Sequence, residues 1–156
     1  MRFKKIKYSD SQVHLELENV TGGGDEQTAK DVISIKSGKE PREEFHVARR
    51  GLKNALIELC EVQGLPKDAI TVTGVSLAYK GEYDDMHCVI TGYRTLKNSA
   101  GSQPLNTPQK AAELTEESKP EPGDILDEKT IESLKAFIAE AEEYYRGTKL
   151  QTELLA

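Results

Sequence analysis

The chain has 156 residues, of which 37% are hydrophobic and 31% are charged, and its formal net charge is −6. This length fits one domain with an appendage and excludes two full-sized domains. No apolar run approaches the ~20 residues of a membrane-spanning helix, and the basic N-terminus lacks the apolar stretch of a secretion signal. We therefore expect a cytoplasmic protein with no membrane partner.

The charge distribution and the cysteine content indicate which partners and which cellular compartment to expect. Residues 1–97 carry 15 basic and 15 acidic side chains, whereas residues 98–156 carry 6 and 12. A neutral body with an acidic appendage excludes strong overall attraction to nucleic acid, but it leaves room for a local basic patch. Cys60 and Cys88 lie far apart and form no disulfide framework, which indicates a reducing compartment.

The first third of the chain predicts three strands of one meander. Residues 12–20 alternate strictly between apolar and polar side chains, the pattern of a half-buried strand. Residues 3–8 alternate imperfectly and are rich in lysine, so we expect an edge strand, where lysine discourages further pairing. The glycines at 22–24 predict a loop, and residues 31–37 predict the third strand.

A helix is expected after Pro41. Apolar residues recur there at intervals of three and four, the pattern of a helix that covers one face of a sheet. Gly64 can adopt the left-handed conformation that ends a helix and Pro66 prevents continuation, so we place the helix end at Gly64. The apolar stripe consists of Phe45, Ala48, Leu52, Ala55, Leu56, Leu59 and Val62.

Two further strands complete the expected body, which spans residues 1–97. Residues 70–79 change phase after Gly74, which indicates a bulge. Residues 86–93 have apolar side chains on both faces, which favours a central strand. The sequence thus predicts an α+β fold with a mainly antiparallel five-stranded sheet, in the order β-β-β-α-β-β, and one covering helix.

The C-terminal third predicts a linker and a helix. Residues 98–123 are rich in Ser, Pro, Asn, Gln and Glu, so we expect an irregular linker. Helical character returns in the acidic segment 124–156, with Asp127 as the N-cap. Its apolar residues follow the spacing of a coiled-coil seam over roughly two heptads, so they must pack against the body or against the same helix of another subunit. We expect a homo-oligomer in which Leu134 and Ile138 are buried between chains. The seam, which supplies the expected contacts, consists of Ile131, Leu134, Ile138, Ala141 and Tyr145.

One segment resembles a known group of proteins. It contains Gly74-Val75-Ser76-Leu77, then Val89-Ile90-Thr91-Gly92, then Asn106-Thr107-Pro108. Residues 70–110, about a quarter of the chain, resemble in these elements the C-terminal half of small bacteriophage-encoded proteins. Such proteins lie among early or recombination genes and carry no settled activity. The resemblance therefore implies a phage protein in the host-cell cytoplasm, and it implies no particular chemistry.

No sequence pattern predicts an enzyme or a cofactor site. The glycines at 22–24 lack the following Gly-Lys-Ser/Thr of a phosphate-binding loop. Cys60 with His46 or His87 has the residue types of a thiol nucleophile and its base, but a lone helical cysteine is more often a small buried hydrophobe. We therefore expect no catalytic residue and no cofactor.

A metal site is also not expected. Asp84, Asp85, His87 and Cys88 crowd one turn and have side chains that can ligate metals. Adjacent strand residues point to opposite faces of a sheet, so His87 and Cys88 do not readily share one ion.

Basic and aromatic residues form a candidate nucleic-acid surface. The central helix and the first strand both carry clusters of Lys and Arg, which suit a phosphate backbone. Glutamates on the same helix can instead pair with these bases on an ordinary solvated face. Tyrosines of the strands can stack on bases or pack on the sheet. The candidate contacts are Lys4, Lys5, Arg42, Arg49, Arg50, Lys53 and Tyr93.

Two functions follow as hypotheses. The absence of a catalytic or metal-binding motif and the coiled-coil-like seam of the C-terminal helix favour a non-enzymatic phage protein. Such a protein would bind a host or defence protein, or hold a small nucleotide between subunits. The alternative is a single-stranded DNA-binding accessory factor of phage replication or recombination, which uses the basic residues and tyrosines of the body.

Overall fold

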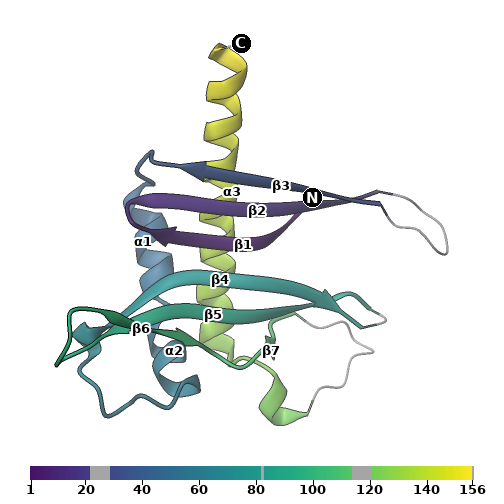
Figure 1. Ribbon diagram of the computed structural model, residues 1–156. Coiled ribbons are helices and arrows are strands. Elements are labelled where there is room, and N and C mark those ends of the chain that lie inside the picture. The colour runs from purple at the N-terminus through teal and green to yellow at the C-terminus, as the bar shows by residue number, and fades with distance from the viewer. Residues whose placement is uncertain (22–28, 82, 114–120, 156) are drawn as a thin grey trace.

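The computed structural model describes residues 1–21, 29–81, 83–113 and 121–155, which form seven strands and three helices (Figure 1). The α+β class and the antiparallel sheet are as predicted. The strands are β1 (Arg2–Ser9), β2 (Gln12–Thr21), β3 (Ala29–Ser37), β4 (Ile70–Lys80), β5 (Asp85–Thr95), β6 (Ser102–Asn106) and β7 (Lys110–Ala111). The helices are α1 (Glu43–Arg50), α2 (Lys53–Leu59) and α3 (Glu128–Leu155).

The strands form one antiparallel sheet in the order β3-β2-β1-β4-β5-β6, and β7 also pairs with β5. The N-terminal meander and the central position of β5 confirm two predictions. The count of five strands is wrong, because β6 and β7 lie in the segment 98–123 that was expected to be irregular. Pro104 fits β6 because a proline is tolerated in an edge strand, where one side of the ladder is unused.

The prediction that residues 3–8 form an edge strand is wrong. β1 lies between β2 and β4 in the middle of the sheet. Its imperfect alternation comes from a bulge at Lys4, since the register with β2 shifts between Phe3 and Lys5. A bulge moves the following side chains to the other face, so the buried Phe3 and Ile6 share a face although they are three positions apart.

β1 and β4 are joined over only a short stretch. Their register comprises three residue pairs, the last of which is Lys7 with Gly74. A Cβ added to Gly74 would lie 1.9 Å from the Ile6 backbone oxygen, so only glycine permits this approach. The predicted bulge at Gly74 is confirmed by a register shift between Val72 and Gly74. Beyond the three pairs the two strands diverge at both ends.

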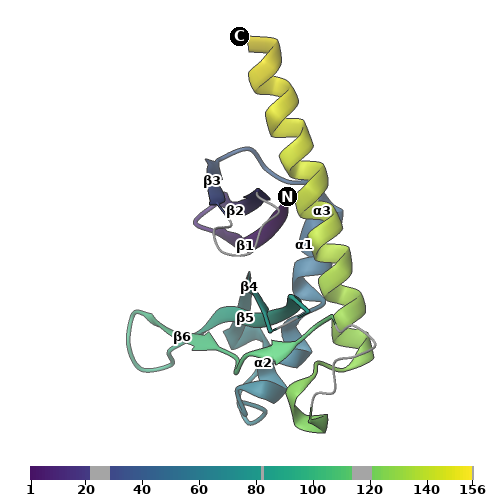
Figure 2. The same ribbon diagram turned by 90° about the vertical axis from the view of Figure 1, so that its right-hand side faces the viewer.

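The helices pack on one face of the sheet, and α1 and α3 lie side by side there (Figure 2). The predicted single helix is divided by Gly51 and Leu52 into α1 and α2. A Cβ on Gly51 would lie 3.1 Å from the Ser133 hydroxyl oxygen of α3, so glycine lets the two helices approach. α2 packs beneath β5, where Gly92 leaves room for Leu56.

The second helix ends before Gly64, contrary to the prediction. Glu61 adopts the left-handed conformation with φ 56°. The Val62 N–H donates to the Ile57 carbonyl at 3.0 Å, and the Glu61 N–H donates to the Glu58 carbonyl at 3.2 Å. This pair of bonds is a Schellman cap. A non-glycine residue takes the strained position because Val62 then folds back onto the core.

The apolar stripe of α3 packs within its own chain. Leu134 and Ala141 are completely buried in the single chain, together with Phe137. Ile131, Ile138 and Tyr145 are partly buried against the same core. The expected burial of Leu134 between chains is therefore wrong, because α1 and the sheet of the same chain already cover it. The contact of Ile138 between chains stays a prediction. No described helix is long and apolar enough to span a membrane.

The N-cap of α3 yields a testable prediction. The predicted cap is confirmed, because Asp127 Oδ1 accepts a hydrogen bond from the Thr130 N–H at 2.7 Å. Asp127→Ala is expected to lower the free energy of unfolding by about 1 kcal/mol, measured from urea unfolding. Hydrogen bonds from Thr130 lower the pKa of Asp127 below its usual 3.8. The stabilisation is therefore complete above that value and is lost as the pH falls through the folded-state pKa.

The control for this prediction is Asp124→Ala, which removes an exposed carboxylate close by. It is expected to leave the free energy of unfolding unchanged within about 0.5 kcal/mol. Equal effects of the two variants at neutral pH, or an Asp127→Ala effect that does not diminish as the pH falls below 3.8, would contradict the capping role.

Candidate functional site

The face of the sheet opposite the helices carries a cluster of basic residues. Lys7 of β1 is in register with His14 of β2, which is in register with Lys36 of β3. Lys5 lies on the same face, 3.9 Å from a Glu16 carboxylate oxygen. Burial, and then repulsion from Lys5, lower the pKa values of Lys7 and His14. This open face therefore has a local positive potential within an acidic chain.

A pocket of about 490 Å³ lies where β1 and β4 diverge. We call this pocket the notch. One wall comes from the end of β1 and its turn to β2, and the other comes from the first residues of β4 with their neighbours on β5 and β6. Its residues are Tyr8, Ser9, Asp10, Arg49, Thr71, Thr73, Tyr93 and Ser102.

Arg49 of α1 reaches the notch from the helical side. The residue is only 9% exposed. Its Nη1 donates to the Val72 carbonyl at 2.5 Å, and its carbon Cζ lies 5.2 Å from the centre of the Tyr8 ring. Nε is buried without a hydrogen-bond partner, and no described carboxylate forms an ion pair with this guanidinium. Burial lowers the pKa of Arg49, yet an arginine remains charged at neutral pH.

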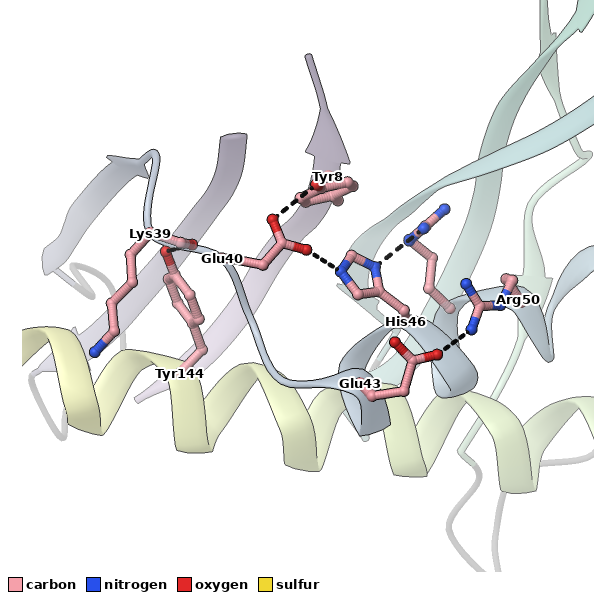
Figure 3. A network of polar contacts seen from close by, with 8 residues as sticks. Tyr8, Lys39, Glu40, Glu43, His46, Arg50 and Tyr144 are labelled. Atoms are coloured by element: carbon pink, nitrogen blue, oxygen red, sulfur yellow. Dashed lines mark hydrogen bonds and ion pairs between the residues drawn. The ribbon is translucent and has the colours of Figure 1, made fainter. Parts of the chain in front are cut away.

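A short chain of hydrogen bonds holds Arg49 in place. Glu40 lies between Tyr8 and His46 and bonds to both, at 3.1 Å and 2.7 Å (Figure 3). Arg49 Nη2 lies 3.1 Å from His46 Nδ1. Because an arginine can only donate, Nδ1 must accept this bond, so Nε2 carries the proton that bonds to Glu40. Glu40 thereby fixes the histidine tautomer and, through it, the guanidinium.

Arg2 can be compared with Arg49, because it lies where β1 and β4 separate at the other end of their short paired stretch. Its carbon Cζ lies 3.9 Å from the centre of the Tyr79 ring. Its Nε lies 2.7 Å from Glu18, whose side chain is 4% exposed, and its Nη1 also pairs with Asp84. The charge of Arg2 is thus neutralised, which is expected of a structural arginine. Arg49 occupies the other divergence without a direct ion pair, and the carboxylate of Glu40 is linked to it only through His46.

The predicted basic residues do not form one surface. Arg42 makes two bonds of 2.6 Å to Glu140 and so ties α1 to α3. Arg50 pairs with Glu43 at 2.5 Å on the helical side. Lys53 is half-buried at the start of α2, and Lys4 occupies the bulge of β1. Of the seven candidates, only Lys5, Arg49 and Tyr93 lie on the open face or in the notch.

The other chemical candidates are distributed as follows. Burial raises the pKa of the Cys60 thiol, and it raises that of Cys88 to about 12, which disfavours a nucleophilic thiolate. Cys88 is buried under the helices and His87 lies on the opposite face. Among the described residues no three His, Cys, Asp or Glu side chains are grouped for a metal ion. The glycine loop at 22–24 lies outside the described residues.

Several residues in and behind the notch were not anticipated from sequence in this role. Behind it, Glu40 carries no distinguishing motif, and His46 was considered only as a base for Cys60. Thr71 and Thr73 have the pattern of ordinary strand threonines. Their position just before the predicted bulge in β4 was the one sequence signal that could have marked them as site residues. Comparisons of the chain with protein-family models, with curated proteins and with solved structures found no match.

Proposed function

We propose that the protein binds single-stranded nucleic acid on the open face of its sheet, with the notch as the principal contact. The observation that carries this proposal is the burial of Arg49 without a direct ion pair, since the carboxylate of Glu40 is linked to it only through His46. A desolvated cation costs free energy unless an opposite charge compensates it. A phosphate group in the notch supplies that charge.

Neighbouring residues fit the same ligand. Lys5 and Lys7 stand on the open face, and Lys7 is the last β1 residue paired with β4 before the notch. Basic side chains along one face can follow a phosphate backbone. Tyr93 lines the notch next to Arg49, and a tyrosine ring offers a stacking surface that accepts any base.

The sequence-based preference for a partner-binding protein loses part of its basis, because two of its five expected contact residues, Leu134 and Ala141, are buried within the single chain. What remains in its favour is the end of α3, which extends past β3 in both views (Figures 1 and 2). Leu150 there is 58% exposed. A homo-oligomer formed through this end of α3 is our second candidate, and light scattering measures it directly.

Fluorescence anisotropy with a labelled oligothymidylate tests the first proposal. We expect wild-type affinity to fall steeply between about 50 and 200 mM salt, because each phosphate contact releases counterions. Arg49→Met should raise the Kd about tenfold, equivalent to about 1.4 kcal/mol, and should reduce the salt slope by about one. Tyr93→Ala should raise the Kd by a similar factor.

Arg50→Met is the matched control. It removes the same charge from the neighbouring residue, but that guanidinium is exposed and paired with Glu43. We expect less than a twofold change in Kd. Failure of the wild-type protein to bind the oligonucleotide at low salt would contradict the proposed function. Equal effects of the two substitutions on Kd would show that the notch does not contact the strand.

A further inference from the structure

We propose that the notch takes a phosphate monoester, either the 5′-terminal phosphate of a strand or the phosphate of a free mononucleotide. This inference rests on the proposed function and specifies which part of the nucleic acid enters the pocket. It starts from the size and walls of the notch, the single buried charge within it, and the hydroxyl groups that line it.

The dimensions of the notch suit one nucleotide unit. About 490 Å³ lies within the range of small-molecule pockets, roughly 300–1,000 Å³. Ser9 at the end of β1 and Asp10 of the β1–β2 turn form one side, and Ser102 of β6 contributes to the other. A phosphodiester inside a strand is bonded to a sugar on each side, so the strand would have to extend out of the notch past both walls. A terminal phosphate is bonded to one sugar, so the strand extends past one wall only.

The charge in the notch favours the monoester. At neutral pH a phosphate monoester carries about −1.5 to −2, whereas a diester carries one negative charge. Arg49 is desolvated, and attraction between charges strengthens as the local dielectric constant falls. The second negative charge is therefore worth more beside Arg49 than beside Lys5 and Lys7 of the open face, which are only partly buried.

Hydroxyl groups supply the remaining donors. Ser9, Thr71 and Thr73 line the notch together with Ser102. Each hydroxyl can donate one hydrogen bond, and a monoester presents three terminal oxygens as acceptors. A second arginine is not required, because neutral donors can complete the coordination of the phosphate.

Asp10 and Tyr93 orient the rest of the nucleotide. A carboxylate can only accept hydrogen bonds, so the phosphate lies away from Asp10 and a sugar hydroxyl or base amino group lies toward it. Asp10 adopts a positive φ of 52° in the β1–β2 turn, which fixes its position at the rim. Tyr93 lines the same pocket and stacks on the base.

The test compares two oligothymidylates that share a 3′ fluorescent label and differ only in a 5′ phosphate or a 5′ hydroxyl. For wild type we expect about tenfold tighter binding of the phosphorylated strand, equivalent to about 1.4 kcal/mol. The ratio should fall to one in Arg49→Met and persist in Arg50→Met. In parallel, AMP should raise the melting temperature of the wild type more than adenosine does.

The outcomes separate this inference from the proposed function. Equal affinity for both strands, with loss in Arg49→Met, would overturn the monoester pocket and leave strand binding intact. Stabilisation by AMP without binding of either strand would support the pocket and contradict the strand proposal. No response to any of these probes would overturn both. Urea unfolding of each variant ensures that a lost ratio does not reflect a lost fold.

Discussion

Replacing Leu134 by aspartate is expected to unfold the protein. Leu134 is 0% exposed within the single chain and shares its core cluster with Phe137, whose ring centre lies 5.0 Å from that of Phe45. The substitution loses apolar packing and buries an unpaired polar group, so the free energy of unfolding should fall by at least about 4 kcal/mol. Domains are stable by only about 5–15 kcal/mol. Circular dichroism and urea unfolding measure the loss.

The matched control is Ala136→Asp, which introduces the same side chain two residues further along α3 at an exposed position. Its cost should stay within about 1 kcal/mol, mostly from helix propensity. A folded Leu134→Asp protein whose mass by light scattering drops from oligomer to monomer would contradict burial within the chain and restore the contact between chains that the sequence predicted.

Replacing Arg2 by methionine is expected to cost about 2–3 kcal/mol of unfolding free energy. The substitution leaves Glu18, with 4% of its side chain exposed, without its counter-charge, and an unpaired buried carboxylate is strongly destabilising. Asp84 is well exposed and adds little. Adding Glu18→Gln to Arg2→Met should recover most of the loss. Urea unfolding of the two single variants and the double variant measures the coupling.

The unfolding free energy of Arg49→Met is to be compared with that of Arg2→Met. Arg49→Met removes a guanidinium that is more deeply buried than that of Arg2, but no described carboxylate loses a direct ion pair. Two lost hydrogen bonds, to Val72 and His46, are offset by the removed desolvation cost, so we expect a change of about 1 kcal/mol or less. An Arg49→Met protein as destabilised as Arg2→Met would mark Arg49 as a structural residue and weaken the case for the notch.

Residue spacing predicted the helices and strands well where it was regular over several turns or alternations. Strict alternation in residues 12–20 predicted β2, and spacing of three and four predicted α1, α2 and α3 with the cap at Asp127. The predictions failed where a single residue changes the phase. The Lys4 bulge disguised a central strand as an edge strand, and Gly51 divided one expected helix into two.

The candidate site was predicted only in part. Arg49, Lys5 and Tyr93 were named as nucleic-acid contacts, but the same list contained Arg42 and Arg50, whose side chains are paired with glutamates on the helical side. At helical spacing all three arginines look equivalent. Arg49 differs only because its side chain meets the divergence of β1 and β4, two strands separated by more than 60 residues in the sequence.

The sequence by itself determined the element types, the α+β class, the single covered face of the sheet and the acidic C-terminal helix, because each follows from local periodicity and composition. Only the tertiary structure decided which strands are central, where α3 buries its apolar stripe, and which buried arginine has no direct ion pair. Those properties depend on pairing between distant segments. A residue's pattern in the sequence is the same whether the surface that covers it comes from its own chain or from another.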